Sequence, residues 1–509
     1  MNPVRRKIEK AKAVLAFALL FAAAVVCHAQ GLGGGAQNQG TNNSAASSDR
    51  SGSGSSYSPS SSSLPSAPSG QGGQSPFTSS VPEGKSTGEV LPLSFKEAID
   101  RALRNNLGLL LGSDNVLAAR GQKWKELSAL LPNVSAAATQ SATQIDLAAL
   151  GFRFNFPGIS SVVGPIGTFD ARTYLKSPIF NWELIQRERG AQAGESVAHF
   201  NYKSARELVV LAAGNEYLLT IASSARVDAA QAQVESAQAL YAKAHDQQVA
   251  GVVPAIDALR AHVEFQTRQQ QLIAARNDYA KQKLILARTI GLPPGQEFNL
   301  TDKSPYEPLT PMGLEQALQR AYAQRPDYLA AVQQVRSAQL FRRAATAEHL
   351  PSLNLAGDYG AAGVNIGNSH GVFDVGATLA IPIFAGGRAH ADVLQAEATL
   401  RQSKQQLDSL RGQIDYDVRA ALLDLNSAAD QVEVARQALD LANQTLEQAR
   451  DRFTAGVTDN LEVVQAQESV ATANENFISS LYAHNVAKIS LARAIGFAEE
   501  GVRQYLESK

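Results

Sequence analysis

Few residues of this 509-residue chain have the types and spacings that catalysis or metal binding requires. Its eight histidines include no pair four residues apart, so the HExxH pattern that places two zinc ligands on one helix face is absent. No phosphate-binding loop is present. One GxSxG match occurs, Gly367-Asn-Ser-His-Gly371, but it falls in a turn-rich connection between two expected strands, whereas a nucleophile elbow joins a strand to a helix. A single cysteine excludes a disulfide framework and a Cys-based zinc site. We therefore expect no enzymatic activity and no cofactor.

Two carboxylates stand at matching places in the sequence. Asp257 follows Gly251 by six residues, and Glu462 follows Gly456 by six residues. Each glycine is expected to end a helix in the left-handed conformation. Local roles explain both acids: Asp257 would stabilise the first turn of the next helix, and Glu462 would form a capping box with Asp459.

Composition limits the class of protein. With 46 Lys+Arg against 47 Asp+Glu, the net charge is −1, which argues against binding to nucleic acid through bulk positive charge. Apolar residues make up 44% of the chain, enough for a sizeable core.

The N-terminal region has the composition of an exported protein. Residues 1–29 combine a basic start with a 14-residue apolar run, which is too short to span a bilayer and is typical of a signal peptide. Cys27 leaves acylation open, but Val26 precedes it, and cleavage after Ala29 fits better. Residues 30–90 are rich in Ser, Gly and Pro and are expected to form a flexible leader.

The rest of the chain is a tandem duplication, with one copy over residues 91–300 and the other over residues 301–509. Leu286-Ala-Arg-Thr-Ile-Gly291 matches Leu491-Ala-Arg-Ala-Ile-Gly496, and Ser177-Pro-Ile-Phe180 matches Ile381-Pro-Ile-Phe384. A change in offset upstream indicates a longer hairpin loop in the first copy, near Phe152, Phe154 and Phe156.

Each copy predicts the order helix, strand, strand, long helix, helix. Proline-free stretches predict helices over about 183–249 and 387–455, each roughly 100 Å long at 1.5 Å per residue. Shorter helices are expected over about 93–131, 256–290, 313–348 and 459–495. The second long helix carries a heptad series of large residues from Val418 to Phe453, with an alanine series three residues on. This pattern is typical of a coiled-coil wall.

The predicted strands alternate apolar and polar residues, as transmembrane β-strands do. Examples are Phe373 to Ile381, Leu353 to Tyr359, and Phe169 to Lys176. Lipid does not tolerate the open edges of a four-stranded sheet, so several chains would have to share one barrel. Three copies would give twelve strands and a ring of helices. The strand count alone would also permit a dimer.

These features together resemble the TolC-like outer-membrane efflux proteins. The resemblance covers roughly residues 91–500. It rests on the duplicated unit, on Leu-Pro at the helix-to-strand junctions, and on the motifs of the second copy. Those motifs are Ile381-Pro-Ile-Phe-Ala-Gly-Gly387, Arg325-Pro-Asp327 and Arg452-Phe-Thr-Ala-Gly-Val-Thr-Asp-Asn-Leu-Glu462. The first copy departs from the pattern, with Asn181-Trp182 in place of Gly-Gly and Asn106-Leu107 in place of Arg-Pro.

The resemblance implies a mixed α and β fold, in which a shared transmembrane β-barrel continues into a long periplasmic α-helical barrel. It implies a homotrimeric duct in the outer-membrane lipids, docked on a periplasmic adaptor protein and an inner-membrane transporter. The adaptor-docking tips would be Gly251, Val252, Gly456, Val457 and Thr458. Asp257 and Glu462 would narrow the pore. Gln465 and Thr458 replace an acid and a base that some members carry, which implies a weaker or less cation-selective constriction.

A rival interpretation is a coiled-coil envelope scaffold without a pore, and the alternating strands favour the duct. Drug efflux, metal efflux and protein secretion share one fold, and the sequence does not choose among them.

Overall fold

The computed structural model describes residues 76–151, 162–302, 312–458 and 460–501. The predicted signal peptide, most of the leader, Asp459 and the three phenylalanines near residue 154 lie outside these ranges. The fold is mixed α and β, and the same succession of elements occurs twice. In the first half, α2 (Phe95–Asn105), α3 (Leu107–Ser128), β2 (Asn133–Asp146), β3 (Val162–Phe180), α4 (Trp182–Val249) and α5 (Ala255–Ile290) follow one another. In the second half, the order is α6 (Leu314–Gln324), α7 (Pro326–Ala347), β5 (Ser352–Gly363), β6 (Ser369–Ala380), α8 (Arg388–Thr454) and α9 (Asn460–Ala494).

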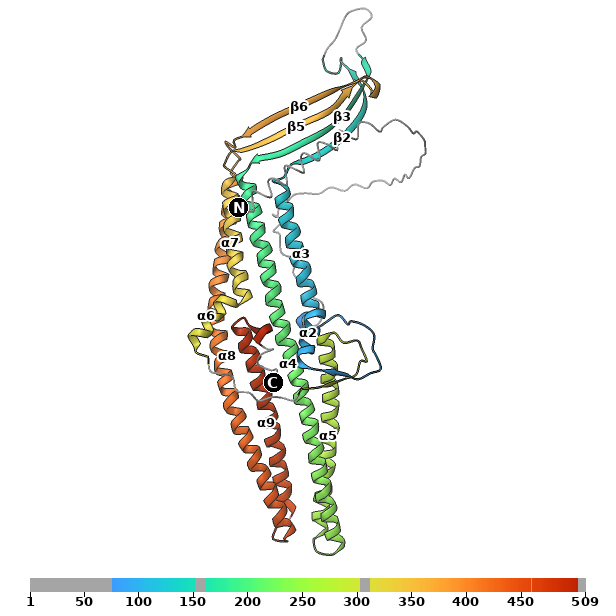
Figure 1. Ribbon diagram of the computed structural model, residues 1–509, viewed down its shortest axis with the longest axis vertical. Helices are drawn as coiled ribbons and strands as arrows, with labels where there is room; N and C mark the ends of the chain where they lie inside the picture. The colour runs from blue at the N-terminus through green and yellow to red at the C-terminus, as the bar shows by residue number, and fades with distance from the viewer. Residues whose placement is uncertain (1–75, 152–161, 303–311, 459, 502–509) are drawn as a thin grey trace, which may run out of the picture. The chain divides into compact units, whose positions relative to one another are not determined.

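Two helices, α4 and α8, run for 68 and 67 residues. Asn181 caps the start of α4, where its side chain accepts a hydrogen bond from Leu184 N at 3.1 Å. An 18-residue window of α4 is apolar enough for a membrane span, with a mean hydropathy of 1.4, but half of it is buried inside the protein. The buried apolar residues of α4 between Val209 and Ile221 belong to a core shared with α2, α5 and α9. The length of α4 therefore serves packing along the helical part of the chain (Figure 1).

The heptad series of α8, from Val418 to Phe453, is buried at both ends of the series and half-buried in between. Val418, Leu425 and Val432 are buried in the upper part, and Phe453 is buried near the lower end. Between them, Leu439 and Leu446 are half-buried. The seam is therefore tightly packed above and below, and less so in the middle.

The predicted helices over 93–131 and 313–348 are each wrong in one respect, because each is broken into two. Asn106 adopts an extended ψ of 128° and caps α3 by accepting from Gly108 N at 2.9 Å. Pro326 begins α7 at a position where the missing N–H costs nothing. The breaks occur at matching places in the two halves, at Asn106 and at the Arg325–Pro326 junction.

The four long strands form one antiparallel sheet in the order β2-β3-β5-β6 (Figure 1). The strand β3 is longer than the predicted 169–176 stretch, and it includes Ser177 to Phe180, with a bulge between Pro178 and Phe180. In the second half, the matching Ile381 to Phe384 lies beyond the end of β6.

The register gives the sheet two unlike faces. Leu355 pairs with Ala377, Tyr359 with Phe373, and Leu353 with Leu379, so these apolar side chains share one face. The opposite face carries Asp358 beside Asp374, together with a charged cluster on β3. There, Arg172 pairs with Asp170 at 2.6 Å and with Asp358 at 3.2 Å.

A second, two-stranded sheet lies beside the helix junctions. There β1 (Leu91–Leu93) pairs in parallel with β4 (Phe298–Leu300). Tyr217 of α4 is fully buried beneath it, and its hydroxyl donates to Leu93 O and to Asp302 Oδ2, both at 3.0 Å. Residues 76–90, the last part of the predicted leader, also lie here: Phe77 packs on the core, and Val81 N donates to Asn105 O at 2.8 Å.

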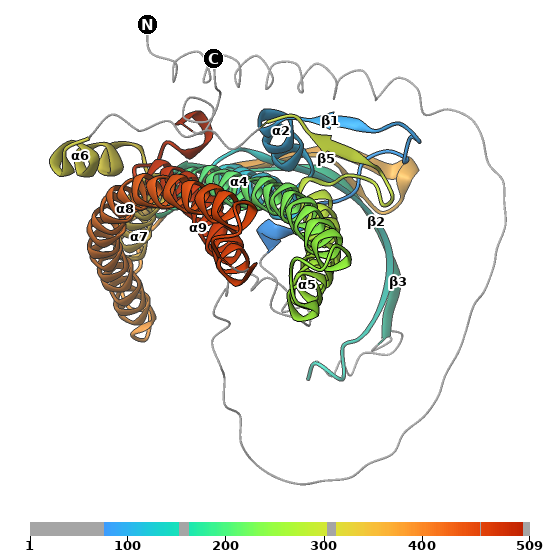
Figure 2. The same ribbon diagram turned by 90° about the horizontal axis from the view of Figure 1, so that it is seen from below.

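Figure 2 shows α8, α9, α4 and α5 following one another along an arc. The helix α4 packs against α5 on one side and against α9 on the other, while α8 packs against α9 and α7. The four-stranded sheet lies at one end of these helices, and the α4–α5 and α8–α9 turns lie at the other (Figure 1).

Candidate functional site

The two interhelical turns have the same backbone geometry. Gly251 has φ of 67° and Gly456 has φ of 71°, the left-handed region that glycine adopts without strain. Val252 N donates to Gln247 O at 2.8 Å, and Val457 N donates to Arg452 O at 3.0 Å. These are the 6→1 hydrogen bonds of a Schellman motif, which satisfies the last carbonyls of each helix. Both glycines therefore end their helices in the left-handed conformation, as predicted.

The same geometry exposes one valine at each turn. Val252 is 70% exposed and Val457 is 69% exposed. Thr458 is half-buried beside Val457.

The four helices that the two turns connect pack into one cluster, which we call the tip core. It consists of eight buried residues, two from each helix: Leu240, Ala244, Ala258, Ala261, Ala449, Phe453, Val463 and Ala466. Asn460, fully buried, donates from Nδ2 to Asp257 O at 2.6 Å and so joins the start of α9 to the start of α5. The small alanines let the four helices approach closely.

The two predicted acids differ in their surroundings. Asp257 is 7% exposed, and its Oδ1 lies 3.5 Å from Arg260 Nη1. Glu462 is more exposed, and its Oε1 accepts from Arg452 Nη1 at 2.7 Å. Arg452, in the last turn of α8, was missed as a partner. It stands four residues before Gly456 while Glu462 stands six residues after it, so the antiparallel geometry of a helical hairpin could have indicated the pair.

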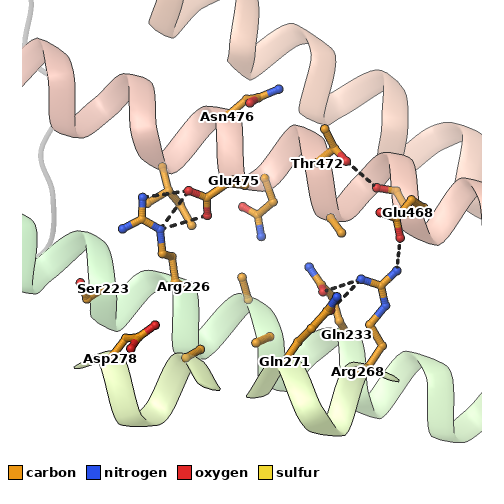
Figure 3. A pocket seen from close by; sticks show the side chains of 16 residues that line it. Ser223, Arg226, Gln233, Arg268, Gln271, Asp278, Glu468, Thr472, Glu475 and Asn476 are labelled. Carbon is orange, nitrogen blue, oxygen red and sulfur yellow. Dashed lines mark hydrogen bonds and ion pairs between the residues drawn. The ribbon is translucent and has the colours of Figure 1, made fainter. Parts of the chain in front are cut away.

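Above the tip core, the two hairpins separate around a pocket of about 640 Å³ between α4, α5 and α9 (Figure 3). The pocket has a polar lining, with amide, hydroxyl and charged groups among alanines. Two arginines cross it (Figure 3). Arg226 of α4 donates to Glu475 of α9 at 2.8 Å, and Arg268 of α5 donates to Glu468 of α9 at 2.6 Å.

Arg268 is the more deeply placed of the two. It is 3% exposed and also donates to Glu264 at 2.6 Å and to Gln271 at 2.9 Å. A weaker contact of 3.5 Å reaches Gln233 of α4. One guanidinium therefore joins three helices, as its planar fork of donors permits.

In the part of the chain that the structure describes, no group of three or more His, Cys, Asp and Glu side chains is arranged to hold a metal ion.

Comparison with known proteins gives consistent results. Residues 317–497 match the family model described as outer membrane efflux protein. Outer membrane protein OprJ of Pseudomonas aeruginosa is 25% identical over 425 residues, which covers 80% of this chain and 85% of OprJ. The alkaline protease secretion protein AprF of the same species is 23% identical over 339 residues, 64% of this chain and 69% of AprF.

The fold is also similar to solved structures. The outer membrane channel CmeC of Campylobacter jejuni superposes with a TM-score of 0.66 at 19% identity, over 79% of this chain and 86% of CmeC.

Proposed function

We propose that the chain, which is similar to the TolC-like outer-membrane efflux proteins, is an outer-membrane protein that extends into the periplasm and acts as a passive export duct. In this proposal the four-stranded sheet contributes to a transmembrane barrel, and the helices continue the duct into the periplasm. The energy for transport comes from an inner-membrane transporter.

The two-faced sheet is the observation that carries the proposal. Its apolar face suits lipid, and the face with Arg172, Asp358 and Asp374 suits a water-filled interior. Among the described residues, β2 and β6 each pair with a strand on one side only. Backbone groups at such edges have no water to bond within a membrane, so another copy has to supply their partners.

Three copies supply twelve strands, which supports a homotrimer. In an antiparallel sheet of four strands the two edge strands run in opposite directions, so β6 of one copy can pair with β2 of the next in the same antiparallel sense. Two copies would supply only eight strands, enough for a narrow barrel filled by its own side chains. The trimer is therefore the assembly that leaves room for cargo.

We further propose that the turns at Gly251–Val252 and Gly456–Thr458 dock a periplasmic adaptor, which connects the duct to the transporter. Exposed valines on rigid turns support this role. Asp257 and Glu462 lie within the first turns of α5 and α9, and we propose that they line the narrowest part of the pore. The cargo then depends on the transporter to which the adaptor connects the duct.

The test is fractionation followed by electrical recording. The duct should be recovered from outer membranes as heat-modifiable trimers that give single-channel conductance in planar bilayers. Recovery as a soluble periplasmic protein would contradict the proposal. Outer-membrane trimers without conductance would favour the coiled-coil scaffold instead.

A further inference from the structure

The charged residues on three neighbouring strands of the large sheet all lie on one of its faces. The strands β3, β5 and β6 carry five Asp, Arg and Lys side chains. Residues directly opposite each other in an antiparallel pair share a face, and so do residues two apart along a strand. The register therefore places all five on the same face: Asp170, Arg172, Lys176, Asp358 and Asp374.

Two of these carboxylates hold Arg172. Its guanidinium lies 2.6 Å from Asp170 Oδ2 and 3.2 Å from Asp358 Oδ2. Across the ladder, Arg172 pairs with Gly360, where a Cβ would lie 2.6 Å from Arg172 Cα. Because glycine has no side chain, the guanidinium can cross β5 at this point and reach Asp358. The side chain of Arg172 remains 29% exposed, so its charge is part of this face.

The third carboxylate, Asp374, has no such counter-charge. It pairs directly with Asp358, so these two side chains are neighbours on one face. Asp374 is exposed and forms no ion pair with any residue that the structure describes. Lys176 lies roughly 13 Å farther along β3 than Arg172. At the level of Arg172, three carboxylates therefore share one guanidinium, and Arg172 limits the negative excess.

We propose that Arg172 sets the charge preference of the barrel interior. The carboxylates of Asp170, Asp358 and Asp374 favour cationic solutes along this wall, and the guanidinium keeps that preference moderate. The inference rests on the proposed duct, in which this face lines water between low-dielectric walls that focus the field of fixed charges. It names cationic solutes as the class of cargo that the barrel favours.

This charged level is separate from the proposed constriction. The turns lie at the opposite end of the long helices from the sheet (Figure 1). At physiological salt, fixed charges act over only about 8 Å. Asp257 and Glu462 therefore do not determine the potential at Arg172, and the two levels can be tested independently.

One introduced cysteine can report the local potential. Gly376 stands two residues after Asp374 and shares its face, and no other part of the chain lies within 4 Å of where its Cβ would be. Val375 belongs to the opposite face and is 72% exposed, so Val375→Cys is the matched control for Gly376→Cys. The native Cys27 lies in the predicted signal peptide, so each introduced cysteine reports alone.

The probes are two methanethiosulfonates of similar size, one with a trimethylammonium group and one with a sulfonate. In outer-membrane fragments, Gly376→Cys should react faster with the cationic probe, after correction for the rates with a free thiol. At about 10 mM salt, charges act over about 30 Å, so adding Asp374→Asn should lower the cation-to-anion rate ratio roughly fourfold. Adding Arg172→Gln should raise the ratio roughly twofold.

Controls separate charge from packing. Arg172→Lys keeps the charge and should keep the ratio. The pair variant Arg172→Gln with Asp358→Asn removes one charge of each sign, so its ratio should stay near that of Gly376→Cys alone; it replaces Arg172→Gln if that variant does not assemble. At about 1 M salt, where charges act over about 3 Å, the ratios should converge. A change in packing alone would persist at high salt.

The outcomes distinguish this inference from the proposed duct. If Gly376→Cys reacts but neither Asp374→Asn nor Arg172→Gln changes its ratio, the inference is overturned and the duct stands. A pair variant whose ratio falls as far as that of Asp358→Asn alone would also overturn the role of Arg172. Faster reaction of Val375→Cys than of Gly376→Cys would place water on the apolar face and contradict the duct itself.

Discussion

At the scale of single residues, Glu462 could act as a local helix cap or as a charge in the pore. Its ion-pair partner Arg452 provides a way to distinguish the two roles. The side chains lie 2.7 Å apart and are 36% and 56% exposed. A local role at the start of α9 needs a hydrogen-bond acceptor, which glutamine also supplies. A role in the pore needs the negative charge.

We expect Glu462→Gln to raise conductance or lower cation selectivity, because Arg452 is then left without its carboxylate. Arg452→Gln should shift selectivity the opposite way by leaving Glu462 unneutralised. Exposed ion pairs contribute roughly 0–1 kcal/mol, so melting temperatures should barely change. Reversal potentials measured in bilayers under a salt gradient check both variants, and unchanged potentials in both would leave Glu462 with a structural role only.

A second residue, Glu207 of α4, makes stability depend on pH. Burial raises its pKa to about 8, Asp327 and Glu499 add to the rise, and Arg493 and Arg325 oppose it. Between its ordinary pKa of about 4.5 and about 8, the folded state holds a proton that the unfolded state releases. Stability from this group is therefore complete below pH 4.5 and is lost as pH rises toward 8.

Glu207→Gln should remove this loss, since glutamine resembles the protonated acid at every pH. The variant should match the parent protein at pH 5 and melt at a higher temperature at pH 9. Thermal melts of detergent-solubilised protein across this range measure the difference. Glu500→Gln, at an exposed position of the same charge type, is the control and should leave the curve of the parent protein unchanged. Parallel curves for Glu207→Gln and the parent would contradict the prediction.

At the scale of elements, substitutions in the two turns can distinguish a role in adaptor docking from a role in stabilising the fold. The exposed side chains of Val252 and Val457 contribute little to the tip core, whose buried residues lie on the helices behind them. Val252→Asp and Val457→Asp should therefore leave trimer assembly and melting temperature nearly unchanged while export falls. Val463→Asp is the contrasting variant, because Val463 is fully buried and a charge there should disrupt the tip itself. Export that survives in both turn variants, alone and combined, would place adaptor docking elsewhere.

Some of the helices, strands and helix breaks could be predicted from the sequence, and others could not. The long helices follow from the absence of proline, and the two faces of the sheet follow from alternation at a period of two. The break at Asn106 could not be predicted from residue type, since asparagine caps helices and also occurs within them. Pro326 did carry the signal for its break, as the first residue of a helix.

The contacts of Arg268 with Glu468 were beyond prediction for a different reason. The two residues stand at unequal distances from their turns, with Arg268 farther along the chain from Gly251 than Glu468 is from Gly456. The pair therefore depends on how the two hairpins are shifted and splayed against each other, which residue spacing within one hairpin does not report.

At the scale of the whole helical part, apolar cores and a polar pocket alternate along the length of the helices. The tip core is apolar, as is the core around Val209, Tyr217 and Ile489 farther along the helices. The pocket between them is crossed by ion pairs (Figure 3). The α4–α5 and α8–α9 hairpins are thus held together by hydrophobic burial at two levels and by arginines at the level between.

The two arginines should contribute very differently to that link. Breaking a buried ion pair costs about 3–5 kcal/mol because a carboxylate is left without its partner. Arg268→Gln does this to Glu264, whose side chain is 14% exposed, while Glu468 at 67% exposed regains water. The expected loss is therefore at the lower end of that range. Arg226→Gln breaks a pair whose side chains are 33% and 52% exposed, so it should cost roughly 0–1 kcal/mol.

Melting temperatures of the two variants, with Arg268→Lys as a third, check this ordering. Lysine keeps the charge but lacks the planar fork that reaches α4, α5 and α9 together, so its melting temperature should fall between those of Arg268→Gln and the parent protein. Hydrogen exchange localises the effect: Arg268→Gln should speed exchange in the tip core and leave the core around Tyr217 protected. An equal loss of stability in Arg226→Gln and Arg268→Gln would contradict the prediction. Burial would then not decide how much each arginine contributes, and exposed ion pairs such as Arg226–Glu475 would hold the hairpins together as strongly as buried ones.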